Sequence, residues 1–230
     1  MSINCRKVIF VDRKRDIIEI LIKMSRKYSI YEIYMDWIKC SAISISNGVT
    51  ILRDEVWKAR EQDYINIMHK YDEKERHSFI YMFQLFIETL ESSPGDILGQ
   101  IFMEINMGSK VTGQFFTPYH ISQMLSAIAV QDLKMDEDGI YRLSEPSCGG
   151  GAMIIASAIA LQKKGINYQE KMDVVAQDLD WNGVYMCYLQ LSMMGIKAIC
   201  VQGDSLTSPY HSGITPKAHI LVTPAKAGFL

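Results

Sequence analysis

The chain has 230 residues, of which 48% are hydrophobic, and its mean hydropathy of +0.02 is typical of a soluble globular protein. It carries 24 Lys and Arg against 26 Asp and Glu, a formal net charge of −2, and therefore lacks the basic excess that stand-alone nucleic-acid-binding proteins usually show. It contains no run of about 18 apolar residues, so we expect no membrane-spanning helix, and its N-terminal apolar stretch is too short for a signal peptide.

The five cysteines, at positions 5, 40, 148, 187 and 200, form no CxxC pair and have no metal-ligand spacing. An odd, scattered set is typical of reduced thiols. We therefore expect a cytoplasmic protein with no metal site and no membrane association.

Apolar and charged residues recur at helical spacing throughout the first half of the chain. The clearest case is one stripe formed by Phe79, Phe83, Phe86, Ile87 and Leu90, which is more often a core-facing pattern than a ligand site. Helices are expected at residues 16–24, 31–43, 54–71 and 76–90.

Two breaks divide this helical region. Asn47-Gly48 indicates a turn between helices, and the run Ser92-Ser93-Pro94-Gly95 is the strongest break in the first half. We expect an N-terminal helical domain over residues 1–94 and a second domain over residues 95–230, which starts with a helix at 96–107.

The second half alternates strands and helices. After an irregular segment, VTGQFFTP, Thr117 is expected to cap a helix at residues 119–130 and Pro118 to lie in its first turn. Alternation of this kind predicts an α/β fold with a mostly parallel sheet. Strands are expected at residues 140–145, 172–176, 198–201 and 219–222, and helices at 152–161 and 181–194.

The central feature is the sequence IYRLSEPSCGGGAM at residues 140–153. It predicts a short strand closed by Glu145 and Pro146, a glycine turn and the start of an apolar helix. Gly149, Gly150 and Gly151 permit positive φ and bring bare backbone close to whatever lies above the turn. Open α/β sheets hold small ligands at such a turn, although the glycines can also serve tight packing alone.

The kind of ligand can be narrowed. The dinucleotide fingerprint GxGxxG and the phosphate loop GxxxxGK[ST] are both absent. Glu145, at the strand tip, repels a pyrophosphate but suits a cationic group such as an amino acid ammonium.

Acidic residues also follow the second and third strands. Asp178 is well placed to bind ribose hydroxyls, and Asp204 can accept a hydrogen bond from an exocyclic amine. Each aspartate alone can equally be a turn or cap residue. Together with Glu145 and the glycine turn, however, they favour a ligand with the three parts of S-adenosylmethionine.

Four motifs in order, VTGQFFTP, SEPSCGGGAM, AQDLD and GDSL, resemble those of the N6-adenine DNA methyltransferases. The likeness is greatest to the modification subunit of type I restriction-modification systems and to phage or plasmid DNA methylases, and it covers about residues 95–222. It implies a truncated Rossmann-like, S-adenosylmethionine-dependent methyltransferase sheet behind a helical domain, with DNA as partner.

By this resemblance the cofactor would be bound by residues from all four motifs. The upstream segment would flank its methionine part, the glycine turn would hold its amino acid end, Asp178 its ribose and Asp204 its adenine. Cys148 is expected to be a small packing residue and no nucleophile. The residues implied are Gln114, Phe116, Thr117, Pro118, Glu145, Pro146, Ser147, Cys148, Gly149, Gly151, Asp178, Leu179, Asp204 and Ser205.

The resemblance is incomplete after the fourth strand. The family's catalytic motif there is Asn/Asp-Pro-Pro-Tyr/Phe, whose first side chain accepts a hydrogen bond from the target amine and whose ring stacks on the flipped base. Thr223 and Pro224 stand at that position, followed by Ala225-Lys226, so the catalytic motif is degenerate. Phe229 can supply a stacking ring only if the loop is displaced. The family's further strands and target-recognition region are not expected here.

Three hypotheses remain open. The chain is an active DNA adenine-N6 methyltransferase whose missing parts come from another chain, a second copy or a partner subunit, or from an unusual loop. Alternatively, it is a degenerate cofactor-binding relative that acts as regulator, decoy or subunit in DNA modification or phage and plasmid defence. The third hypothesis is a methylase fragment with no independent role.

Overall fold

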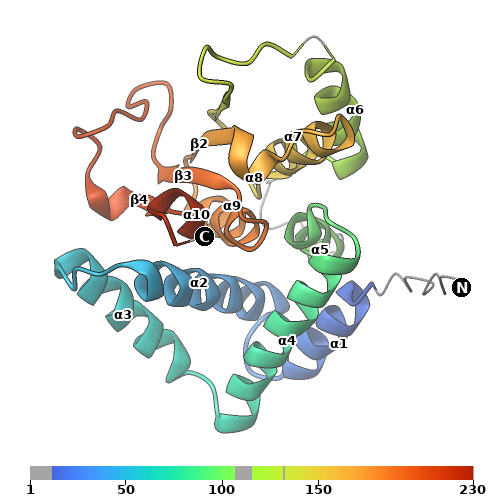
Figure 1. Cartoon of the computed structure of the whole chain (residues 1–230). Coiled ribbons are helices and arrows are strands. Elements are labelled where there is room, and N and C mark those ends of the chain that lie inside the picture. Colours follow the sequence, from blue (N-terminus) through green and yellow to red (C-terminus); the bar gives the residue numbers. More distant parts are fainter. Residues whose placement is uncertain (1–11, 107–115, 132, 230) are drawn as a thin grey trace, which may run out of the picture.

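A computed structural model of the chain describes residues 12–106, 116–131 and 133–229 (Figure 1). The first half is helical, as the sequence predicted, and its helices lie together below the sheet in the view of Figure 1. They are α1 (Lys14–Met24), α2 (Ile30–Val49), α3 (Glu55–Met68), α4 (Glu73–Ser92) and α5 (Ile97–Asn106).

Side-chain caps determine where three of these helices begin. Ser29, Asp54 and Asp72 each accept a hydrogen bond from the backbone N–H three residues further on. Glu75 in turn accepts from the Asp72 N–H at 2.8 Å, which completes a capping box. Caps of this kind each contribute about 0.5–2 kcal/mol to stability.

The expected turn at Asn47-Gly48 is wrong, because α2 continues through both residues to Val49. The Asn47 side chain is 9% exposed and donates to the Trp57 carbonyl and to Glu61 Oε2 of α3. The Trp57 indole donates back to the Asn47 carbonyl at 3.1 Å. Packing against α3 thus overrides the local turn preference of the Asn-Gly pair.

The second half confirms the α/β class. Strands and helices alternate along it, and their bounds lie within a few residues of those predicted. The elements are α6 (Tyr119–Ala129), β1 (Tyr141–Glu145), α7 (Ala152–Lys163), α8 (Tyr168–Lys171), β2 (Met172–Asp178), α9 (Trp181–Met193), β3 (Lys197–Gln202), the 3-10 helix η1 (Lys217–His219), β4 (Ile220–Val222) and α10 (Pro224–Ala227).

The described sheet has the strand order β1-β2-β3-β4. β1, β2 and β3 are parallel, with Glu145 opposite Ala176 and Asp178 opposite Gln202. β4 pairs with β3 in the antiparallel direction, with Val222 opposite Ile199. The first three strands therefore end at one edge of the sheet, whereas β4 ends at the opposite edge.

The core is continuous between the two halves of the chain. α2 packs along α9, and fully buried rings of the helical half, Tyr34, Trp37 and Phe86, belong to the same apolar cluster as Tyr188 of α9. Phe79, Phe86 and Leu90 of the predicted stripe are buried. The division into domains at residues 94 and 95 stays a prediction, although a break between α4 and α5 does fall at residues 93–96.

Candidate functional site

The glycine turn between β1 and α7 is built from backbone conformations that favour glycine. Gly149 has φ +47° and Gly151, the N-cap of α7, has φ +92°. A Cβ on Gly151 would lie 3.1 Å from Cys187 Sγ, and a Cβ on Gly183 of α9 would lie 3.2 Å from the Gly149 backbone. The turn is therefore packed closely on α9, while Gly149 itself stays partly exposed.

The tip of β2 is joined directly to this turn. Asp178 Oδ2 accepts a hydrogen bond from the Gly149 N–H at 2.8 Å, and Oδ1 accepts from the Asp180 N–H at 3.0 Å. The Cys148 N–H donates to the Gln177 carbonyl at 2.9 Å. Each carboxylate oxygen keeps further acceptor capacity, so Asp178 can hold the turn and still accept from a ligand hydroxyl.

Glu145 lies at the same edge. Its Oε1 accepts from the backbone N–H and the hydroxyl of Ser147 at 3.3 and 3.4 Å. Because Glu145 pairs with Ala176 and Asp178 stands two residues further along β2, both carboxylates project from the same face of the sheet. Pro146, Ser147 and Leu179, which is 69% exposed, complete this edge.

Asp204 follows β3 at the same edge but also serves its own turn. Its Oδ1 accepts from the Leu206 N–H at 2.9 Å and from the Thr207 N–H at 3.4 Å. Hydrogen bonds to the ionised form, that of Leu206 first, lower the pKa of the Asp204 carboxyl group. The Gly203 N–H donates to the Asp178 carbonyl at 2.9 Å, which places Asp204 and Ser205 beyond the tip of β2. The turn role and the ligand role, which were alternatives at the level of the sequence, are compatible here.

A residue that sequence reasoning missed, Gln177, holds the segment after Asp204. Gln177 is 4% exposed, its Nε2 donates to the Ser208 carbonyl, and its Oε1 accepts from the Tyr210 N–H, both at 3.0 Å. The only signal in the sequence was an amide directly before the acid that ends the strand.

The upstream segment reaches the turn through Phe116. A Cβ on Gly149 would lie 3.0 Å from Phe116 Cδ1 and Cε1, and the Phe116 ring centroid is 4.7 Å from that of Phe102 in α5. Gln114 lies outside the described residues. Thr117 and Pro118 are exposed; contrary to expectation, Pro118 is itself the N-cap of α6 and no side chain caps this helix.

A cavity of about 490 Å³ lies between α5 and the start of α6. Phe116, Thr117 and Pro118 line it, together with Asp96 and Tyr119. The three described residues of the upstream motif thus share one cavity, and Phe116 borders the glycine turn as well.

Cys148 is buried, with 7% of its surface exposed. The neighbouring Cys187 thiol and burial raise the pKa of the Cys148 thiol. A buried thiol with a raised pKa is a poor nucleophile. The Cys148 side chain is therefore a packing residue of the turn.

Thr223 and Pro224 do not lie at the edge where the catalytic position was expected. β4 is antiparallel to β3, so its end faces the beginning of β3. Thr223 is fully buried; its Oγ1 donates to the Ile196 carbonyl at 2.7 Å and accepts from the Ala198 N–H at 2.9 Å. Pro224 is buried in the first turn of α10. The expected placement is therefore wrong, and Thr223 has a structural role here.

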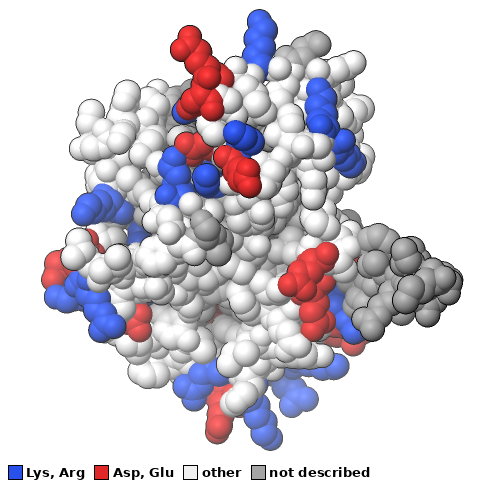
Figure 2. Space-filling model, viewed as in Figure 1, with Lys and Arg blue, Asp and Glu red and all other residues white. Residues whose placement is uncertain are grey.

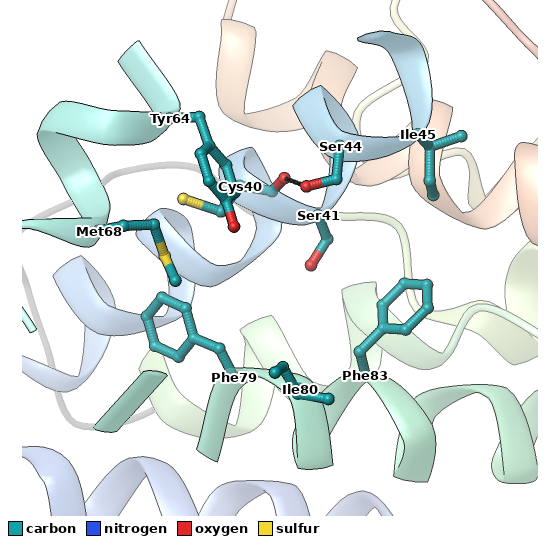
Figure 3. Close-up of a pocket in the computed structure, with 9 residues that line it drawn as sticks. All are labelled: Cys40, Ser41, Ser44, Ile45, Tyr64, Met68, Phe79, Ile80 and Phe83. Atoms are coloured by element: carbon teal, nitrogen blue, oxygen red, sulfur yellow. Dashed lines mark hydrogen bonds between the residues drawn. The ribbon is translucent and has the colours of Figure 1, made fainter. Parts of the chain in front are cut away.

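A second cavity, of about 310 Å³, lies between α2, α3 and α4 (Figure 3). The hydroxyls of Ser41 and Ser44 donate to carbonyls of their own helix, so its walls are almost wholly apolar. It is separate from the sheet edge. It is lined by Cys40, Ser41, Ser44, Ile45, Tyr64, Met68, Phe79, Ile80 and Phe83.

Charged side chains of both signs lie near one another on the face shown in Figure 2. The basic cluster at residues 13–15 is partly paired, because Arg13 contacts Asp16 at 3.1 Å and Glu88 at 3.8 Å. No helix in the described part of the chain is long and apolar enough to span a membrane.

A family model described as N-6 DNA Methylase matches residues 94–225. Among solved structures, the chain is similar to the methyltransferase subunit of a type I restriction-modification system from Streptococcus thermophilus, with 15% sequence identity and a TM-score of 0.43. That match covers 70% of this chain and 35% of the subunit. The search of curated proteins found no match.

Proposed function

Because this chain belongs to the N-6 DNA methylase family, we propose that it binds S-adenosylmethionine at the carboxyl edge of β1, β2 and β3 and serves methyl transfer to adenine N6 in DNA. The observation that carries this proposal is the hydrogen bond from the Gly149 N–H to Asp178. It brings the two features from which ligand binding was predicted, the glycine turn and the acid at the end of β2, into direct contact.

The residues at this edge fit the chemistry of the cofactor. Glu145 offers a carboxylate for the ammonium group, Asp178 keeps acceptor capacity for the ribose hydroxyls, and Asp204 can accept from the adenine amine. The exposed Leu179 side chain supplies apolar surface next to Asp178, and Phe116 flanks the turn. When bound, the cofactor supplies an electrophilic methyl group on a sulfonium.

A second candidate function, cofactor binding without methyl transfer, is favoured by the surroundings of Thr223. The position where the family carries its catalytic side chain is buried and bonded to the beginning of β3. The chain would then act as a regulator or subunit in DNA modification.

Calorimetry with S-adenosylmethionine tests the binding proposal. We expect the wild type to bind and Asp178→Ala to weaken binding at least about tenfold, since one lost charge-assisted hydrogen bond is worth about 1.5–3 kcal/mol. Asp173→Ala is the matched control: Asp173 lies at the other end of β2 and pairs with Lys226 at 2.6 Å, so its loss should leave the affinity unchanged. Absence of binding by the wild type would overturn the proposal.

Transfer of a labelled methyl group to unmethylated DNA separates the two candidate functions. Label on adenine N6 with the purified chain alone supports the first, and cofactor binding without label supports the second. Label that appears only after a partner subunit is added assigns the chain a share in a composite enzyme.

We also propose that the chain associates with a second copy of itself or with a partner subunit. β1 and β4 are the outermost strands of the sheet that the structure describes, and an outermost strand is a place where a second copy or a partner subunit can add. Light scattering at several concentrations checks this, and a monomer at all of them would contradict self-association.

A further inference from the structure

The fully buried side-chain amide of Gln190, on α9, joins three segments of the chain. Its Oε1 accepts from the Leu98 N–H at the start of α5, at 3.0 Å. Its Nε2 donates to Asp96 Oδ1 at 2.9 Å and to the Gly150 carbonyl, in the glycine turn, at 2.8 Å. Both hydrogens of the amide nitrogen are thus used, and the amide oxygen has its partner.

Asp96 explains why this amide has a single orientation. The carboxylate is 3% exposed, and its Oδ1 also accepts from the Gly99 N–H at 2.9 Å. An ionised carboxylate can only accept hydrogen bonds. If the Gln190 amide were reversed, its oxygen would face two acceptors, Asp96 Oδ1 and the Gly150 carbonyl, and both contacts would become repulsive.

The contact between α5 and the turn is close. A Cβ on Gly150 would lie 3.9 Å from both Gly99 Cα and Asp96 Oδ1. The Tyr34 hydroxyl of α2 donates to the Leu98 carbonyl at 2.7 Å, so the network continues into the helical half. A buried network whose members are all bonded holds its parts in one arrangement.

We infer that Gln190 is a positioning residue for the cofactor turn, and that Asp96 fixes the orientation of the Gln190 amide. This inference rests on the proposed function for its effect on cofactor binding. Gln190 touches only the carbonyl of Gly150 on the turn, so it acts through the backbone conformation of the turn rather than on the cofactor.

Three variants test the inference by calorimetry with S-adenosylmethionine. Gln190→Leu leaves the Gly150 carbonyl without its donor and should weaken binding about tenfold, which corresponds to about 1.4 kcal/mol. Asp96→Ala removes the acceptor that orients the amide and should have a similar effect. Asp96→Asn keeps an acceptor oxygen and should bind within about threefold of wild type.

Thr89→Val controls for a general loss of stability. The Thr89 hydroxyl, in α4, donates to the Leu85 carbonyl and accepts from the Arg13 N–H, so its loss lowers the stability of the fold without removing a contact of the turn. We expect Thr89→Val to lower the free energy of unfolding but to keep the cofactor affinity of the wild type.

Amide hydrogen exchange of the free protein gives a readout that does not require the cofactor. The peptide covering residues 145–155 should exchange about tenfold faster in Gln190→Leu and at the wild-type rate in Thr89→Val. If the wild type binds no cofactor, the proposed function fails while this measurement still tests the inference. Unchanged exchange in Gln190→Leu, or equal affinities of Asp96→Ala and wild type, would overturn it.

Discussion

Substitution of Gly149 by alanine tests the contact between the glycine turn and the upstream segment. Gly149 has φ +47°, and the added Cβ would lie 3.0 Å from two carbons of the Phe116 ring. The variant therefore combines two costs: a left-handed conformation for a residue with a side chain, and a contact shorter than the ordinary separation of about 3.5–4.0 Å between carbon atoms.

The two costs can be estimated separately. A left-handed conformation costs alanine about 1–2 kcal/mol, and insertion of a methyl group into a well-packed site costs about 1–3 kcal/mol. Gly165→Ala is the matched control, because Gly165 has φ +78° and nothing lies within 4 Å of its added Cβ. Only the conformational cost applies there, so Gly149→Ala should lose about 1–3 kcal/mol more than Gly165→Ala.

Urea unfolding of both variants measures the difference in free energy of unfolding. A double-mutant cycle with Phe116→Ala then isolates the steric part, which should disappear when the ring is removed. Calorimetry should show weaker cofactor binding for Gly149→Ala, because Phe116 must move. Equal losses for Gly149→Ala and Gly165→Ala would refute the claim that Phe116 packs on the turn.

Two further predictions concern buried polar groups. Thr223→Val leaves the Ala198 N–H and the Ile196 carbonyl without their side-chain partner, so we expect a loss of about 1–3 kcal/mol in urea unfolding and an unchanged cofactor affinity; a loss of affinity with unchanged stability would point instead to a role at the site. Burial raises the pKa of Asp96 above its unfolded value, so ionisation of this residue lowers stability above its folded pKa, and the cost disappears as the pH falls to the unfolded value. Asp96→Asn should therefore unfold at higher urea concentration than wild type at neutral pH, and this difference should shrink on acidification. A difference independent of pH would show that the pKa of Asp96 is the same in the folded and the unfolded protein.

Much of the architecture could be predicted because the signals are local. The periodicity around Phe79 and Phe86 predicted α4, and the alternation of apolar runs with turn residues predicted the α/β half. Asp178 was predicted because an acid at the tip of the strand that follows the glycine turn is well placed for ribose hydroxyls. In the structure its carboxylate accepts a hydrogen bond from the Gly149 N–H.

The direction of β4 could not be predicted in this way. The strand is three residues long, and the segment between Gln202 and Lys217 contains no crossover helix in the structure. A strand that pairs in parallel with the preceding strand usually requires a crossover helix between them. The sequence of this segment does not exclude such a helix. Thr223 was assigned to the site on the assumption that β4 runs parallel to β3. Because β4 runs the other way, Thr223 lies at the opposite edge of the sheet.

The partners of Gln190 were equally hidden from sequence reasoning. Asp96 and Gly150 are far from Gln190 in the chain. The residues next to a single glutamine in an apolar helix do not indicate which groups it will bond to. The same holds for Asn47, whose bonds to α3 replaced the turn that its own dipeptide indicated.

The shared core of α2 and α9 has a consequence for how the molecule melts. Because Tyr34 and Trp37 lie in one apolar cluster with Tyr188, separating the halves would expose large rings to water on both sides. Neither half can then lose its structure while the other persists, so heating should produce a single endotherm whose calorimetric and van't Hoff enthalpies agree.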